Sequence, residues 1–183
     1  FEVYSRPRGE ADSNWMLHAR GVIETVDDPT PIEESGVTVE SLKRRLESIP
    51  AADLYNEFES LDLRLGPAFQ AVEALWSGLN EALGELVLPT ALSPQLAGEP
   101  IHPVLLDACT QVTGAIGWGG RKRLTDKDNT LYLPFQYDRV ALFKPVPSRF
   151  FCHAQLRPHA RAASETGVFD LQLYDEADEL LGH

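Results

Sequence analysis

The sequence predicts an α+β fold in which antiparallel strands pack against one buried helix. Three observations predict it. In the segment 103–117, apolar residues recur at spacings of three and four, as in a helix with one buried face. Several shorter segments alternate apolar and polar residues with a period of two, which is typical of strands. Two of them, 72–79 and 82–88, predict a hairpin that turns around Gly78 and Asn80.

The composition excludes several classes of function. The chain has 183 residues, 43% hydrophobic and 24% charged, so it can bury a core as one domain or as a large part of a bigger one. With 16 basic against 28 acidic residues, its net charge of −12 argues against nucleic acid or an anionic membrane as the main partner. The sequence shows neither an apolar run of membrane-spanning length nor a signal peptide. Two cysteines make no disulfide framework, so we expect a cytoplasmic location.

The N-terminal segments predict strands. Residues 1–6 and 15–26 alternate on either side of a polar turn, and the first six residues carry no start signal. We therefore expect the chain to begin inside a sheet. The predicted return strand stops at His183, so we expect the chain to be truncated at both ends.

Two short helices are predicted after an exposed linker. Residues 27–36 combine prolines with acids, as linkers do. The segment 39–49 is amphipathic, with Ser41 as its expected cap, and a second helix is expected over 52–58. We expect both helices to serve packing rather than chemistry.

A Gly-Pro turn precedes the predicted hairpin. Gly66 and Pro67 force a turn whose backbone lies open, and Phe69 beyond it is large enough to wall a pocket. A loop rich in proline, 89–100, then leads from the hairpin into the central helix.

The central helix carries the residues that indicate chemistry. Pro103 suits a first helical turn, so the helix is predicted to begin at His102/Pro103, and the glycines that follow the segment end it. Asp107, Gln111 and Gly114 form a line at helical spacing beside the apolar stripe. A carboxyl among leucines is partly desolvated and can hold a proton as a general acid, with Gln111 orienting it. The alternative is an aspartate that is merely solvated or capping. The apolar stripe consists of Leu105, Ala108, Val112 and Ala115.

The C-terminal part predicts further strands and a basic loop. The loop 121–127 is basic in an otherwise acidic chain. The predicted strands span 131–135, 139–143, 150–156, 168–174 and a return strand at 180–181.

Two other chemistries fit the sequence poorly. Cys109 lies two residues from Asp107 and points away from its face, so we expect a packed core thiol and no cysteine hydrolase. His153 and His159 have no ligand-like spacing with other histidines, cysteines or acids, so we expect no metal site.

Three motifs follow one another along the chain. They are L-G-P-A-F-Q at 65–70, H-P-V-L-L-D-A-C-T-Q at 102–111 and L-P-F-Q-Y-D-R-V at 133–140. In this order they resemble the dehydratase domain of modular polyketide synthases. The opening F-E-V-Y-S and the W-M-L-H-A-R-G at 15–21 resemble the sequence that precedes these motifs in that family, so the resemblance spans nearly the whole chain.

The resemblance implies a double hot-dog fold, in which two units each wrap a curved antiparallel sheet around a long helix. Residues 1–26 would be the tail of the first unit. Residues 27–62 would be a linker with two short helices, and 63–183 a nearly complete second unit whose central helix is 104–117.

The resemblance also implies an activity. The family removes water from a 3-hydroxyacyl chain on the phosphopantetheine arm of an acyl carrier protein, which gives a 2,3-enoyl thioester. A histidine of the first unit acts as base at C2, and an aspartate of the second unit acts as acid at the C3 hydroxyl. Asp107 matches that aspartate, and Gln111 matches the residue that holds it.

The implied substrate tunnel and partners follow. The tunnel would be lined around the Gly-Pro turn and the helix start. No cofactor is expected beyond the carrier's arm. The expected partners are the acyl carrier protein, docked on the loop 121–127, neighbouring synthase domains and a second copy in a homodimer. The expected substrate-binding residues are Leu65, Gly66, Pro67, Phe69, His102, Pro103 and Gly114.

Two departures from the family pattern matter. The family's catalytic histidine belongs to an upstream His-x-x-x-Gly motif that is not in this sequence, and His18 matches a strand position instead. Where the family usually has tyrosine before Gly-Pro, this chain has Leu65, which removes one hydrogen bond, typically about 0.5 to 1.5 kcal/mol. Two alternatives therefore stay open: a vestigial structural or dimerisation domain of a megasynthase, and a relative that shifts a double bond or closes a ring.

Overall fold

The computed structural model describes residues 1–8, 14–25, 36–96, 98–118, 133–157 and 166–183. By their contacts the residues form two compact units, Phe1–Glu34 and Ser35–His183. The first unit contains β1 (Glu2–Ser5) and β2 (Met16–Arg20), an antiparallel pair with exposed side chains. Two strands are thus confirmed there, the second shorter than predicted.

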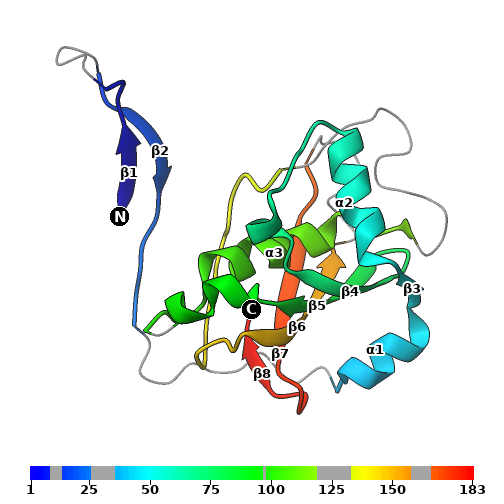
Figure 1. Cartoon of the computed structure of the whole chain (residues 1–183). Coiled ribbons are helices and arrows are strands. Elements are labelled where there is room, and N and C mark those ends of the chain that lie inside the picture. The colour runs from blue at the N-terminus through cyan, green and yellow to red at the C-terminus, as the bar shows by residue number, and fades with distance from the viewer. Residues whose placement is uncertain (9–13, 26–35, 97, 119–132, 158–165) are drawn as a thin grey trace. The chain divides into compact units, whose positions relative to one another are not determined.

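A six-stranded antiparallel sheet is the framework of the second unit (Figure 1). Each strand pairs with its neighbours in sequence, in the order β3-β4-β5-β6-β7-β8. The predicted hairpin is confirmed as β4 and β5, and the register places Gly84 of β5 opposite Cys152 of β6. The strands are β3 (Glu47–Ile49), β4 (Val72–Ser77), β5 (Glu81–Val87), β6 (Arg149–Leu156), β7 (Phe169–Tyr174) and β8 (Leu180–Gly182).

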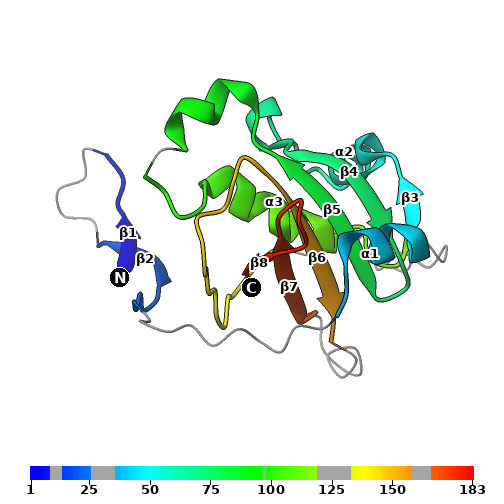
Figure 2. The same cartoon turned by 90° about the horizontal axis from the view of Figure 1, so that it is seen from below.

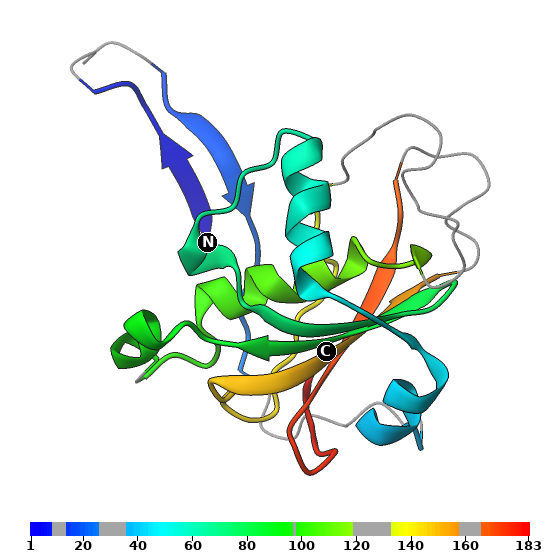
Figure 3. The ribbon, with the colours of Figure 1, turned by 45° about the vertical axis from the view of Figure 1, so that its right-hand side comes forward.

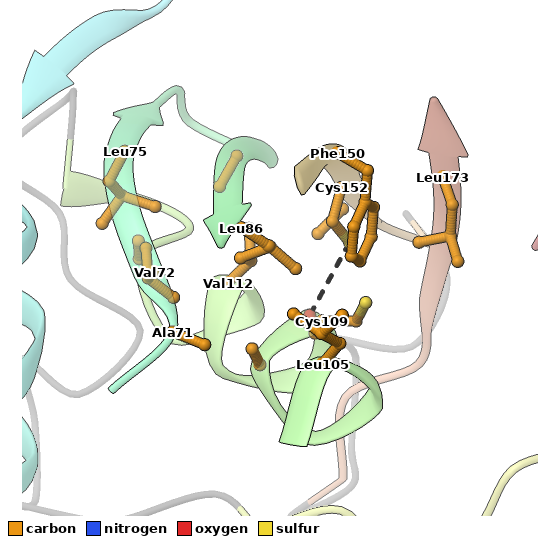
Figure 4. Packing of buried hydrophobic residues seen from close by; sticks show 14 of the residues in the cluster. Ala71, Val72, Leu75, Leu86, Leu105, Cys109, Val112, Phe150, Cys152 and Leu173 are labelled. Carbon is orange, nitrogen blue, oxygen red and sulfur yellow. Dashed lines mark hydrogen bonds between the residues drawn. The ribbon is translucent and has the colours of Figure 1, made fainter. Parts of the chain in front are cut away.

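The helix α3 (Pro103–Thr113) packs on one face of this sheet. Figure 4 shows side chains from β4 to β7 pointing toward α3, as expected for a hot-dog unit. The helix approaches β5 most closely at Gly84, where a Cβ atom would lie 2.4 Å from Cγ2 of Val112. Only a residue without a side chain allows this approach. The core residues that Figure 4 labels are Ala71, Val72, Leu75, Leu86, Leu105, Cys109, Val112, Phe150, Cys152 and Leu173.

The helix α1 (Val39–Arg45) packs on the opposite face of the sheet (Figure 3). Side chains alternate along each strand, so Leu83 and Phe151 face α1 while their sequence neighbours face α3. The cap of α1 is Thr38, whereas the sequence predicted Ser41. Ser41 occupies the third helical position of a capping box, in which each side chain accepts a hydrogen bond from the other residue's N–H at 3.1 Å.

The remaining helices frame the α3 side. α2 (Ala51–Ser60) buries Leu54 and Phe58 in the same core as α3. Two short 3-10 helices, η1 (Pro67–Phe69) and η2 (Thr90–Gln95), follow the Gly-Pro turn and the hairpin (Figure 2). By contacts α1 and α2 belong to the same unit as the sheet.

The prediction of strands near the third motif is wrong for the residues that the structure describes there. Residues 133–140 form no strand, and Leu142 makes a single isolated bridge with Gly182. Their apolar side chains are exposed, with Phe135 93% accessible, so the apolar pattern does not mark a buried face there. Pro134 and Pro145 also withhold backbone donors. Residues 131–132 and the basic loop 121–127 lie outside the described residues.

A buried histidine lies beneath α1 in contact with a partly exposed ion pair. The Nε2 atom of His153, a residue only 1% exposed, lies 2.7 Å from Oε2 of Glu81, and Arg45 donates to both oxygens of that carboxylate at 3.1 and 2.6 Å. Since Nε2 faces a carboxylate, it carries the hydrogen of the neutral ring. Burial lowers the pKa of His153, although Glu81 opposes this shift. Burial raises the pKa of Glu81, but hydrogen bonds from Arg45 and His153 outweigh it and bring that pKa below its ordinary value.

Acid is expected to destabilise the fold through His153. Because its pKa is 6.5 in a model peptide and lower in the folded protein, the unfolded chain takes up the proton first. Stability is therefore fully present above pH 6.5 and is lost as the pH falls below it. Urea unfolding between about pH 7.5 and about pH 5.5 measures the loss. His153→Gln, which can still donate to Glu81 but cannot be protonated, should lose less; an equal loss in both proteins contradicts this role.

Candidate active site

The helix α3 begins where the sequence predicts and ends earlier. Pro103 is its first residue, and Nδ1 of the buried His102 accepts a hydrogen bond from the Val104 N–H at 3.2 Å. The α-helix stops at Thr113, because the following backbone tightens to hydrogen bonds three residues apart. Gly117, with φ of +93°, then turns the chain away, as glycine readily does.

The predicted line on α3 is present. Nε2 of Gln111 donates to Oδ2 of Asp107 at 2.8 Å and to the backbone carbonyl of Phe69 at 3.0 Å. Both hydrogens of the amide are thus used, and both go to acceptors. Gln111 is 7% exposed and its Oε1 is buried without a hydrogen-bond partner among the described residues. The amide therefore ties the carboxyl of α3 to the Gly-Pro turn in one orientation.

A pocket of about 150 Å³ lies beside this pair. Asp107, Gln111 and Gly114 form its α3 wall, and residues of α2, β7 and the turn before η1 complete it. Most of its lining is apolar, so a carboxyl in it meets less water than one on an open surface. The lining residues are Glu57, Phe58, Leu61, Leu63, Leu65, Asp107, Thr110, Gln111, Thr113, Gly114, Trp118, Leu133, Pro134 and Phe169.

The structure brings together some of the predicted site residues. Leu65, Asp107, Gln111 and Gly114 all line the pocket. Phe69 reaches the site through its backbone carbonyl, while its side chain, 43% exposed, lies outside the pocket lining. The other predicted residues, Gly66, Pro67, His102 and Pro103, are not part of that lining.

Several pocket residues were not predicted. Thr110 and Thr113 share the exposed edge of α3 with Asp107 and could have been found by helical spacing. Phe58 was expected to serve packing only. Trp118 and Phe169 are far apart in sequence, and no local pattern announces that β7 approaches the end of α3.

Two tyrosines lie within the electrostatic reach of Asp107. Burial raises the pKa of Tyr55 to about 12, although a hydrogen bond from the Val72 N–H lowers it, and the Asp107 charge raises it further. Burial, followed by the Asp107 charge, also raises the pKa of Tyr137, whose hydroxyl is hydrogen-bonded to Thr110. Both phenols therefore stay protonated near neutral pH.

Of the residues considered for the two disfavoured chemistries, Cys109 and His153 are described, and His159 lies outside the described residues. Cys109 is a buried free thiol in the core whose pKa is raised well above its ordinary value by burial and by Cys152, as expected for an unreactive packing residue. No group of three or more histidines, cysteines and acids is placed to hold a metal ion within the described ranges. Over the same ranges, no helix has the length and apolarity needed to cross a membrane.

Comparisons with known proteins agree on one family. The family model described as polyketide synthase dehydratase N-terminal domain matches residues 34–182. Among curated proteins, the spectinabilin polyketide synthase system protein NorA' of Streptomyces orinoci is 28% identical over 167 residues, which cover 91% of this chain and 4% of that protein.

Solved structures give the same family. The dehydratase domain of the CurH module of curacin polyketide synthase is 30% identical, with a TM-score of 0.75, over 99% of this chain and 60% of that domain. An inactive mutant of the CurK dehydratase, in which a histidine is replaced by phenylalanine, is 25% identical, with a TM-score of 0.73, over 99% of this chain and 58% of that one. The chain thus spans about 60% of the solved dehydratases and a small part of the curated synthase, and the likeness confirms the hot-dog fold. This chain belongs to the polyketide synthase dehydratase family.

Proposed function

We propose that this chain forms the acid half of a dehydratase site. The substrate is a 3-hydroxyacyl chain on the phosphopantetheine arm of an acyl carrier protein, and the product is a 2,3-enoyl thioester. The observation that carries the proposal is the Asp107 carboxyl, which is held by Gln111 on the wall of an apolar pocket. An oriented carboxyl on the wall of an apolar pocket is what a general acid for an alkyl hydroxyl requires.

The hydrogen bond from Gln111 assigns roles to the two carboxyl oxygens. Oδ2 of Asp107 accepts from the amide, so Oδ1 is the oxygen that carries the proton in the acid form. In the elimination a base removes the C2 proton, the C2–H electron pair forms the C2=C3 double bond, and the C3–O bond breaks. The Oδ1 proton passes to the departing hydroxyl, which leaves as water.

The base is proposed to come from a histidine outside this chain. The described residues that line the pocket include no histidine. Replacing one histidine inactivates the CurK dehydratase, a structural neighbour whose chain is longer than this one. General acid and base contributions are each worth about 10² to 10⁴ in rate, so this chain's carboxyl needs such a partner for full activity.

The proposal is tested by presenting the complete domain with a 3-hydroxyacyl carrier protein. Loss of one water from the acyl chain, followed by mass spectrometry, is the expected result. The vestigial alternative is favoured by the pocket's lack of a described histidine and by Leu65, which gives the wall a methyl surface in place of a hydroxyl. It predicts no loss of water from any acyl chain. A product that has lost the same water but carries a shifted double bond or a new ring would favour the isomerase or cyclase alternative.

Gln111→Leu is expected to lower kcat by about tenfold to a hundredfold, because a hydrogen bond to a charged group is worth about 1.5 to 3 kcal/mol. KM should change little, since Gln111 acts by orienting Asp107. Steady-state kinetics of the complete domain measure both constants, and Gln95→Leu makes the same replacement at an exposed position of η2. A raised KM with kcat intact would contradict the orienting role and indicate direct contact with substrate.

A further inference from the structure

We infer that the pocket admits only a short, uncharged acyl chain and that Phe58 sets the limit. This inference rests on the proposed function, because it names the substrate class of the same site. Asp107 on α3 and Gly114, the residue just after its end, both line the pocket, and over these seven residues a helical rise of about 1.5 Å per residue separates them by about 10 Å. A chain that places its C3 hydroxyl at Asp107 therefore extends along the helix toward Gly114 and Phe58.

Phe58 lies directly against the backbone of α3. A Cβ atom on Gly114 would be 3.1 Å from Cε1 and Cζ of the Phe58 ring, and both residues line the pocket. Because Gly114 has no side chain, the Phe58 ring fits into the space that a side chain would occupy. Together they form a wall that one methyl group would disturb.

The ring of Phe58 is fixed from behind. It meets Tyr55 in an edge-to-face contact with ring centroids 6.5 Å apart and planes at 71°. The Tyr55 hydroxyl accepts a hydrogen bond from the Val72 N–H at 2.9 Å, so β4 holds the tyrosine that holds the phenylalanine. Phe58 is only 8% exposed. A wall supported in this way does not swing aside for a longer chain at low cost.

Volume and charge define the chain that fits. A cavity of about 150 Å³ holds about six carbon atoms, the size of a benzene ring. The charged side chains among the described lining residues are Glu57 and Asp107, both acids. None of the described lining residues is basic, so a chain that ends in a carboxylate would lose its hydration there without gaining an opposite charge, and it should be excluded.

The test uses the complete domain and 3-hydroxyacyl-pantetheine thioesters of about four to about twelve carbons. In the wild type, kcat/KM should rise about fourfold for each methylene that fits in the pocket. At the first chain length that no longer fits, kcat/KM should fall at least about tenfold. Phe58→Leu should move the fall about two carbons longer, and Gly114→Ala should move it shorter, because the new methyl group drives the ring into the pocket. Leu54→Val, a core change on α2 outside the pocket, should leave the fall in place.

Amide analogues of the same chain lengths, whose dissociation constants are measured by calorimetry, separate this inference from the proposed function. If the domain binds only the short analogues and dehydrates none, the function fails and the pocket limit stands. Equal affinity and turnover across the series overturn the limit. So does a limit that fails to move in both Phe58→Leu and Gly114→Ala, or one that moves in Leu54→Val as well.

Discussion

Asp107→Asn in the complete domain is expected to abolish dehydration and to keep the fold. The amide has the shape of the carboxyl, and its oxygen can take the place of Oδ2 and still accept the hydrogen bond from Nε2 of Gln111. It cannot deliver an acidic proton, and general acid catalysis is worth about 10² to 10⁴ in rate. Single-turnover kinetics measure the loss, and circular dichroism with thermal unfolding checks the fold.

A matched control accompanies this variant. Asp53→Asn makes the same chemical change at an exposed residue in the first turn of α2. Its turnover should equal that of the wild type. If Asp107→Asn turns over substrate at the wild-type rate, Asp107 is not the acid, and the proposed function falls with it.

Gly84→Ala is expected to give the largest loss of stability among the single changes proposed. Its Cβ would lie 2.4 Å from Cγ2 of Val112, where β5 supports α3, so helix and sheet must separate. Overpacking of this kind costs about 1 to 3 kcal/mol of unfolding free energy. Urea denaturation of the complete domain measures it. Because α3 carries Asp107, the same shift should also lower kcat.

The double variant Gly84→Ala with Val112→Ala isolates the cause. Shortening Val112 removes the methyl group that the new Cβ meets, so the two changes should cost less together than the sum of their separate costs. Gly66→Ala, where nothing lies within 4 Å of the new Cβ and φ is −65°, should be nearly neutral for stability. Strict additivity of Gly84→Ala and Val112→Ala would show that the contact between β5 and α3 does not limit stability.

For the central helix and the hairpin, predictions that depended on neighbours in the chain agree with the structure, whereas the cap predicted at Ser41 is Thr38. The helix start at His102/Pro103 and the line of Asp107 with Gln111 follow from helical geometry and need no partner. The β4–β5 hairpin follows likewise from a local pattern. The strand prediction near 133–140 failed because its outcome depended on distant segments, and the apolar residues there face no sheet. The predicted end of the central helix was also wrong, because the backbone after Thr113 changes locally to hydrogen bonds three residues apart.

By itself, therefore, the sequence determined the family motifs, the helix that carries Asp107 and the residue, Gln111, that hydrogen-bonds to it. Only the tertiary structure decided the rest of the site. Phe58, Trp118 and Phe169 come from three separate elements, and they reach one pocket because the sheet holds those elements around α3. The carbonyl that anchors Gln111 lies 42 residues away, at Phe69. The physical reason is the distance along the chain over which each feature is set. Helical spacing places residues a few positions apart on one face, whereas the depth of a pocket depends on how closely buried surfaces of distant segments pack.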